Sequence, residues 1–190
     1  MLGKRGIGAL GTLALLFHFN VSAQAQTKTE PVLRGGGGNT PVDCDTVGDN
    51  LLINCGFESG DFAPGWTLSG PDPVHNFVST TAAHSGSFGA QLGSVQSFGC
   101  ISQTVTTTSG QLYTLSFWLS NSLRPNNFQV FWGPGDFPAK VSGDLLNMPD
   151  FDYTKFTITG LFGTGSGLDR VVFCADNDPS YFFLDDIVLD

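Results

Sequence analysis

Two adjacent acids near the C-terminus are the side chains of this chain that most need a chemical explanation. Asp185 and Asp186 stand inside an otherwise apolar run, residues 181–190. Because a strand alternates its faces, one of the two carboxylates is expected to point toward the core. A buried, unpaired charge is costly, so that carboxylate needs a bound cation, hydrogen-bond donors or a raised pKa.

Four short motifs follow one another in residues 50–190. They are Asn54 to Glu58 (Asn-Cys-Gly-Phe-Glu), Gly65-Trp66, His84 to Ser87 (His-Ser-Gly-Ser) and Leu184 to Ile187 (Leu-Asp-Asp-Ile). In this order they resemble the jelly-roll carbohydrate-binding modules of families four, nine and twenty-two. Cys55, beside the turn glycine, is a departure from the sequence pattern of those modules. The resemblance implies an all-β fold, a jelly-roll β-sandwich of two antiparallel sheets, that binds a polysaccharide or glycan without catalysis. It also implies that Trp66 is a core residue.

The resemblance further implies a structural calcium ion that joins the first and last strands. Its carboxylate ligands would be Glu58, Asp185 and Asp186, with oxygen atoms of the turn that ends at Ser87, and hard oxygen donors of this kind suit Ca²⁺. The residues allow an alternative. Glu58 would then cap the turn, and the aspartates would accept hydrogen bonds from backbone amides.

One segment, residues 111–120, has two clearly different faces. Its apolar face consists of Tyr113, Leu115, Phe117 and Leu119. Trp118 lies on the other face among hydroxyl side chains, as strand alternation places it. A flat indole beside hydroxyl groups is suited to stacking on the apolar face of a sugar ring. The alternative is an indole covered by a loop or a second layer.

A second segment, residues 127–132, extends this hypothesis. If it pairs near Trp118, Gln129 and Phe131 join the indole and make an aromatic and amide surface for a saccharide. The preceding loop then supplies a polar rim, from Arg124, Asn126 and Asn127. Ordinary cross-strand packing is the alternative for these side chains.

The N-terminus has the pattern of an export signal. Lys4 and Arg5 precede an apolar run, residues 7–19, and Ala23-Gln24-Ala25 supplies a signal-peptidase site. We therefore expect a signal peptide in residues 1–25 and a secreted protein, extracellular or periplasmic. Residues 26–49 are rich in Gly and Pro and poor in apolar side chains, which predicts a flexible segment. The domain would then occupy residues 50–190.

Charge excludes some partners. The chain has 8 basic and 17 acidic residues, and two of the basic ones lie in the predicted signal, which leaves a net charge of −11. Nucleic acid is therefore not an expected partner. Beyond the signal no apolar stretch is long enough to span a bilayer, so membrane insertion is not expected either.

The four cysteines indicate two disulfides in an exported chain, with three pairings available. We favour Cys44 with Cys55, and Cys100 with Cys174, because the second pair would join strands far apart in sequence. A zinc site is the alternative. It is disfavoured because no Cys-x-x-Cys or neighbouring histidine pair is present.

Short apolar runs alternate with Gly, Pro, Asn and Asp clusters throughout the expected domain, a pattern typical of a sandwich. The predicted strands are 51–54, 66–69, 76–82, 87–93, 99–107, 111–120, 127–132, 139–146, 153–162, 169–176 and 181–189. No Gly-x-Ser-x-Gly motif occurs and no catalytic residue is assigned. Two other functions stay open: an extracellular adhesion or matrix protein that contacts other proteins, and a polysaccharide lyase or hydrolase.

Overall fold

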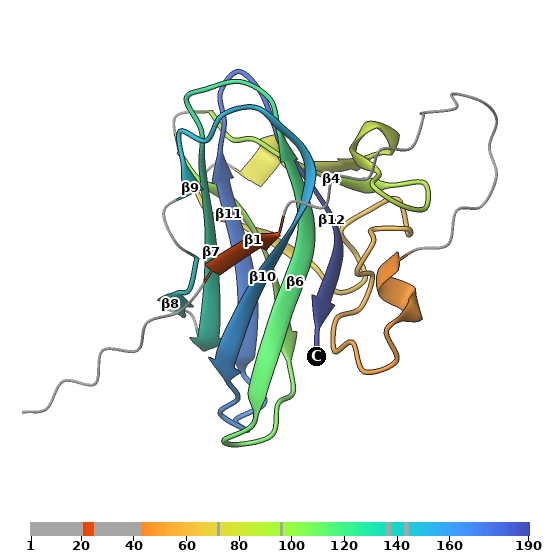
Figure 1. The fold of residues 1–190 in the computed structure, drawn as a ribbon, viewed down its shortest axis with the longest axis vertical. Helices are drawn as coiled ribbons and strands as arrows, with labels where there is room; N and C mark the ends of the chain where they lie inside the picture. The colour runs from red at the N-terminus through yellow and green to blue at the C-terminus, as the bar shows by residue number, and fades with distance from the viewer. Residues whose placement is uncertain (1–20, 25–42, 72, 96, 136–137, 143–144) are drawn as a thin grey trace, which may run out of the picture.

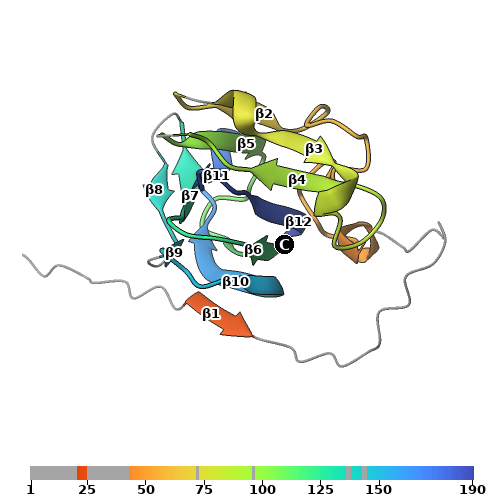
Figure 2. The same cartoon turned by 90° about the horizontal axis from the view of Figure 1, so that it is seen from above.

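The described residues form two antiparallel β-sheets that pack face to face, which confirms the predicted jelly-roll sandwich (Figures 1 and 2). The computed structural model describes residues 21–24, 43–71, 73–95, 97–135, 138–142 and 145–190. Within these ranges the helices are short 3-10 turns: η1 (Asp43–Thr46), η2 (Pro73–His75) and η3 (Thr80–Ala82). None of the helices described is long and apolar enough to cross a membrane.

The first sheet, here sheet A, contains the last strand of the chain at an inner position. Its order is β1 (Val21–Gln24), β10 (Phe151–Phe162), β6 (Leu112–Asn121), β12 (Phe182–Leu189), β4 (Gly89–Leu92) and β3 (Phe77–Ser79). Strand β1 falls in the predicted signal segment and pairs with β10, with Val21 opposite Ile158. The rest of that segment, and residues 26–42, lie outside the described residues.

The second sheet, here sheet B, covers the other side of the core. Its order is β2 (Thr67–Ser69), β5 (Gly99–Val105), β11 (Asp169–Asp176), β7 (Asn127–Pro134) and β8 (Ala139–Lys140), and β9 (Leu145–Leu146) also pairs with β7. Figure 2 shows the two sheets as separate layers, with β2, β5, β11 and β7 in one and β10, β6, β12 and β4 in the other. The alternating apolar residues of both sheets face each other across this interface.

Most predicted strands are present, but the one predicted at 51–54 is wrong. Asn54 has a left-handed backbone with φ of 54°, and the preceding residues hold β12 through other hydrogen bonds. The Leu51 N–H donates to the Leu189 carbonyl at 2.9 Å, and the Asn50 amide donates to the Ile187 carbonyl at 3.0 Å. An Asn side chain that bonds backbone groups competes with a regular ladder, so the ends meet without a strand.

The folded unit begins before the predicted boundary at residue 50. Cys44 is 1% exposed and belongs to the main core cluster, and its disulfide with Cys55 closes over the start of the domain. The second disulfide, Cys100–Cys174, joins β5 to β11. Both predicted pairings are confirmed, and the domain includes η1.

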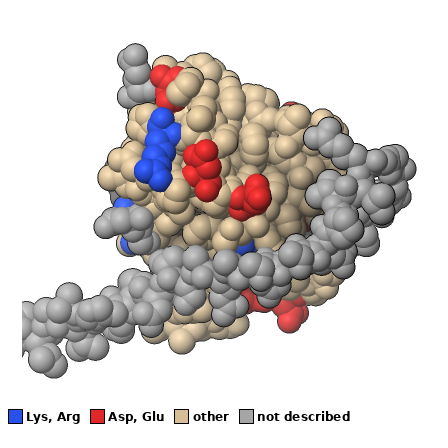
Figure 3. Space-filling model, turned by 45° about the horizontal axis from the view of Figure 1, so that its top comes forward, with Lys and Arg blue, Asp and Glu red and all other residues tan. Residues whose placement is uncertain are grey.

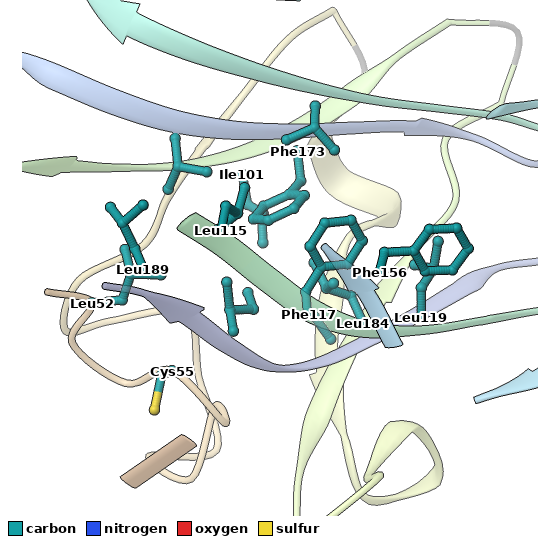
Figure 4. Close-up of a cluster of buried hydrophobic side chains, with 14 of the residues drawn as sticks. Leu52, Cys55, Ile101, Leu115, Phe117, Leu119, Phe156, Phe173, Leu184 and Leu189 are labelled. Carbon is teal, nitrogen blue, oxygen red and sulfur yellow. The ribbon is translucent and has the colours of Figure 1, made fainter. Parts of the chain in front are cut away.

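The core is built from aromatic rings that the two sheets contribute from opposite sides (Figure 4). Phe173 of β11 is fully buried, and its ring centroid lies 5.1 Å from that of Phe117 in β6 and 6.0 Å from those of Trp66 and Phe128. Figure 4 shows Phe173 and Phe117 projecting from different strands into one layer. Trp66 is 4% exposed, as its predicted core position requires.

This packing predicts the cost of removing one ring. Phe173→Ala is expected to lower the free energy of unfolding by about 3 to 5 kcal/mol, because it removes buried area and leaves a cavity among three other rings. Phe162→Ala is the control, since Phe162 is 56% exposed at the end of β10 and its loss should cost less than about 0.5 kcal/mol. Urea unfolding of the two variants measures the difference, and equal losses would contradict the core assignment.

Candidate functional site

The Asn54 to Glu58 motif and the Gly65-Trp66 motif stabilise the loop between them and position Trp66. The Asn54 amide donates to Ser59 Oγ and to the Asp61 carbonyl, both at 2.9 Å, and the Asn54 carbonyl accepts the Trp66 indole N–H at 3.1 Å. Gly65 has φ of 105°, and a Cβ there would lie 2.8 Å from the Ile53 carbonyl oxygen. These residues therefore have structural roles.

Glu58 caps the turn of the His-Ser-Gly-Ser motif. Its carboxylate accepts the Ser87 N–H at 2.9 Å and the Phe88 N–H at 2.9 Å. Gly86 lies so close beneath this carboxylate that a Cβ would come within 2.4 Å of Glu58 Oε1, and its φ is 60°. Ser87 thus contributes an N–H donor to Glu58 here.

Both aspartates of the last strand are buried, whereas alternation predicts only one. Asp185 is 0% and Asp186 is 2% exposed. Asp185 stands opposite Trp118 on the outer face of sheet A, where the turn 84–88 covers it and donates to it from the His84 and Ser85 N–H groups. Asp186 has φ of 48°, and the register of β12 against β6 shifts after Asp185, which marks a β-bulge that redirects side chains. Strand alternation alone therefore does not predict the burial of the two carboxylates.

Each buried carboxylate is surrounded by donors. Asp185 accepts the N–H groups of His84 at 2.7 Å, Ser85 at 3.1 Å and Asp186 at 2.8 Å. Asp186 accepts the Ser85 hydroxyl at 2.8 Å and the Cys44 N–H at 3.4 Å, and its other oxygen lies 2.7 Å from His84 Nδ1. These contacts join β12 to η1 and to the turn 84–88.

Burial raises the pKa of Asp185 to about 8, and the neighbouring charge of Asp186 adds to the shift. The three backbone N–H donors act in the opposite direction, because they stabilise the carboxylate. Burial and the same two charges also raise the pKa of the Tyr153 hydroxyl. A pKa raised in this way reduces the fraction of Asp185 that is charged at neutral pH.

Hydrogen-bond donors surround both aspartates and account for their burial. This is the alternative to a bound ion that the sequence left open. Among the described residues, one group of three potential metal-ligating side chains has its ligand atoms within 4.8 Å of one another. The group is Cys44, Asp45 and Cys55, and its two cysteines form a disulfide. Glu58 and the two aspartates do not form such a cluster. A calcium ion held by all three would require them to move closer, and the ion stays a prediction.

Trp118 lies on the outer face of sheet A, as predicted, but another ring covers it. The His84 imidazole stacks on the indole with ring centroids 4.0 Å apart and an interplanar angle of 17°. Tyr153 meets the same imidazole edge-on at 5.0 Å, and its hydroxyl donates to the Ala82 carbonyl. The turn that carries His84 therefore occupies a ring face that a sugar would need.

Gln129 and Phe131 do not join Trp118, so this part of the predicted surface is wrong. Both lie on β7 in sheet B, whereas Trp118 lies on β6 in sheet A, and each projects away from the core on its own side of the sandwich. The 111–120 and 127–132 strands follow one another in sequence, but the chain crosses from one sheet to the other between them. Sequence proximity suggested a pairing that the topology does not make.

Strand register places Gln129 and Phe131 in a set of outward-facing rows on sheet B. One row is Ser69, Cys100, Cys174 and Gln129; the next is Thr67, Ser102, Val172, Phe131 and Lys140; the third is Thr104, Arg170 and Gly133. The rows enclose a groove of about 410 Å³, the sheet B groove. It is lined by Ser69, Gly70, Cys100, Phe131, Pro138, Arg170, Val172 and Cys174.

The sheet B groove combines an apolar floor with polar side chains. Phe131 packs with Val172 and the Cys100–Cys174 disulfide in a small cluster separate from the main core. Arg170 is held beside this floor, because its guanidinium donates to Ser102 Oγ at 2.7 Å. Sequence reasoning missed Arg170, although alternation along 169–176 places it on the face opposite to Val171 and Phe173.

Two of the three predicted rim residues, Asn126 and Arg124, have different positions. Asn126 is 2% exposed, and its amide is used within its own loop, since it donates to the Leu123 and Met148 carbonyls and accepts the Met148 N–H at 2.9 Å. Arg124 is exposed and donates to the Met148 carbonyl at 3.2 Å. Asn126 therefore shapes the loop, and its predicted role as a hydrogen-bonding rim is not supported.

A second cavity, of about 400 Å³, lies where β7 begins and β11 ends. It is lined by Pro125, Asn126, Asn127, Leu146, Asn147, Asp176 and Asp178. Partial burial raises the pKa of Asp176, and the charge of Asp178 adds to this. The Gln129 amide donates to Asn127 Oδ1 at 3.4 Å and so links this loop cavity to the sheet B groove.

Comparison with known proteins supports the fold. No protein-family model and no curated protein sequence matches the chain. The structure of the carbohydrate-binding module TmCBM61 in complex with β-1,4-galactotriose matches with a TM-score of 0.59 and 21% identity, over 74% of this chain and 97% of that one. The CBM22-1–GH10 modules of a Clostridium thermocellum xylanase match with a TM-score of 0.53 and 13% identity, over 74% and 28% of the chains.

The same fold also occurs in enzymes. A cyclase from Fischerella sp. TAU matches with a TM-score of 0.55 and 19% identity, over 73% of this chain and 94% of that one. At these identities the likeness shows a jelly-roll sandwich of the type found in carbohydrate-binding modules. Since one fold hosts binders and enzymes, function has to be argued from the site.

The geometry around Glu58 generates a direct test. Gly86→Ala and Gly110→Ala both place a side chain on a left-handed backbone, but no atom lies within 4 Å of a Cβ at Gly110. Gly110→Ala should therefore cost about 1 kcal/mol of unfolding free energy. Gly86→Ala should cost about 2 kcal/mol more, because it displaces the carboxylate that caps the turn.

Thermal and urea unfolding of both variants measure this difference. Equal losses for the two alanines would show that the Glu58 carboxylate is not held against Gly86.

Proposed function

We propose that this protein is a secreted, non-catalytic module that binds a polysaccharide or glycan in the sheet B groove. The observation that carries the proposal is the position of Phe131, whose ring lies on an apolar floor with the Arg170 guanidinium beside it. Carbohydrate-binding sites need this combination, because sugar rings have apolar C–H faces and hydroxyl edges. Export is supported by the two disulfides, which persist in oxidising compartments.

Rigid strands position the polar groups of the groove. Gln129 and Ser102 belong to β7 and β5, inner strands that are paired on both sides, and Ser69 belongs to the edge strand β2, which pairs with β5. Side chains on strands are held more precisely than side chains on loops. The outward surface of β11 runs from Arg170 to Asp176, a length of about 20 Å at the rise per residue of an antiparallel strand. A ligand of several sugar units fits this length.

The absence of catalysis is supported by the lining of the groove. In the described residues that line it, no Asp, Glu or His occurs, so general acid–base chemistry has no obvious group to use. Glycoside hydrolysis needs a pair of carboxyl groups flanking the bond. The Asp176 and Asp178 pair lies in the loop cavity, at the far end of the same face. Product release from incubated polysaccharide would favour the enzyme alternative.

Trp118 is the weaker candidate for the sugar platform. Its indole is stacked with His84, which is itself tied to Asp186, so a sugar would have to displace a packed turn. The two surfaces lie on opposite sides of the sandwich, and one experiment can separate them. An extracellular adhesion or matrix role would leave both surfaces without a glycan and would instead require protein partners.

Native affinity electrophoresis through gels that contain soluble polysaccharides tests the proposal. The panel includes β-1,4-galactan, since the TmCBM61 neighbour was solved with β-1,4-galactotriose. One polysaccharide should retard the protein, and Phe131→Ala should weaken that binding about tenfold, because it removes the stacking ring. Trp118→Ala is the matched control and should bind as the wild type does.

Loss of binding in Trp118→Ala alone would move the site to sheet A. No retardation in any gel would favour the adhesion or matrix alternative, which a pull-down of extracellular proteins would then test.

We also propose a structural calcium ion at Glu58, Asp185 and Asp186, which is supported by the two adjacent buried carboxylates of Asp185 and Asp186 and would lie away from the sheet B groove. An ion that binds only the native state stabilises it by mass action. Excess chelator is therefore expected to lower the melting temperature while affinity for glycan at 25 °C is retained. Differential scanning calorimetry with and without chelator measures the shift. An unchanged melting temperature would assign the three acids to their hydrogen-bond donors alone.

A further inference from the structure

The sheet B groove differs in charge from the rest of the protein. The chain has 8 basic and 17 acidic residues, and six basic residues remain once the predicted signal is excluded. Two of these six, Arg170 and Lys140, belong to the outward rows of this one groove. Lys140 lies opposite Phe131 in the register of β8 and β7, and Arg170 lies two residues from Val172 on β11.

The described outward positions of this groove carry no acid. In the described residues, none of the outward positions of the three rows that enclose the groove is Asp or Glu. Asp169, at the start of β11, is buried, and the first acid on the outward face of β11 is Asp176 at the other end of the strand, where it lines the loop cavity. The face therefore has a cationic end at Arg170 and an acidic end at Asp176.

Arg170 is built into the site as a positioned donor. Its guanidinium donates to Ser102 Oγ at 2.7 Å, which fixes the plane of the group beside Phe131 and Val172. A guanidinium carries five N–H donors in a planar fork that matches a carboxylate with two parallel hydrogen bonds. The disulfide, the phenyl ring and the valine form a floor of low polarity, and charge interactions are stronger over such a floor than in water.

From these observations we propose that the ligand of the sheet B groove is an acidic polysaccharide, one that contains uronic acid units, and that Arg170 reads the carboxylate. The inference rests on the proposed function, because it names the class of glycan that the same groove takes. A chain with a net charge of −9 repels an acidic polymer over most of its surface. Binding should therefore depend on the few cations of this groove rather than on basic residues elsewhere.

The test uses the purified protein and two polysaccharides with the same sugar backbone: polygalacturonate, whose carboxylates are charged, and its fully methyl-esterified form, whose carboxyl groups are neutral. Arg170→Gln removes the positive charge, and Lys155→Gln removes one from β10 on the other sheet, where Lys155 pairs with Trp118. Wild type and Lys155→Gln should bind polygalacturonate at least about tenfold more tightly than the ester. Arg170→Gln should lose this difference, as expected for a charge-assisted hydrogen bond.

Folding of Arg170→Gln is checked by its melting temperature, and Arg170→Lys provides a second variant. Lysine keeps the charge but not the fork, so it should recover part of the preference for the acid. Three results would overturn the inference. Equal affinity for the two polymers, with Phe131→Ala still impaired, would leave the proposed function standing and exclude an acidic ligand. Equal effects of Arg170→Gln and Lys155→Gln on the preference for polygalacturonate would exclude the groove as the site that recognises the carboxylate. Failure to bind any polysaccharide would overturn both proposals together.

Discussion

Burial of two adjacent carboxylates in the middle of the last strand constrains much of this structure. Asp185 and Asp186 cannot be buried without donors, and those donors come from three separated segments: the turn 84–88, the η1 helix and β12 itself. The arrangement draws the first described residues of the domain, from Asp43, against the C-terminal strand. Because the two ends of the domain are held together in this way, the edge strands and loops of the sandwich pack around a single core.

The motifs that carry the resemblance to carbohydrate-binding modules are mainly devices of the fold. Asn54 and Trp66 bond one another, Glu58 caps the turn at Ser87, and Gly86 gives that turn the space it needs. Residues with such structural roles do not identify what the sandwich binds. Since the fold neighbours include both sugar-binding modules and a cyclase, the ligand has to be argued from the site.

The two outer faces of the sandwich differ in how far other parts of the chain cover them. On sheet A a turn folds back over the strands, and His84 stacks on Trp118 while pairing with a buried acid. On sheet B the strands lie open in a groove whose floor is a cross-strand disulfide, a phenyl ring and a valine. A covered face contributes stability, whereas an open face on rigid strands is available for a ligand. This difference is the basis on which we propose a ligand site on sheet B.

The sequence by itself predicted most of the strands and the pattern of the core, because alternation and Gly, Pro and Asn turns are local properties. It left three disulfide pairings available and favoured the one that the structure has. It also singled out Gln129 and Phe131, whose outward positions follow from alternation along one strand. Only the tertiary structure decided which strands share a sheet, so it alone separated Phe131 from Trp118 and added Arg170. It also decided that both aspartates are buried, since the turn 84–88 covers Asp185 on the outer face of sheet A and a bulge at Asp186 breaks the alternation on which the sequence argument relied. Pairing between distant strands and local departures from ideal geometry depend on the packing of the whole chain, which no local pattern records.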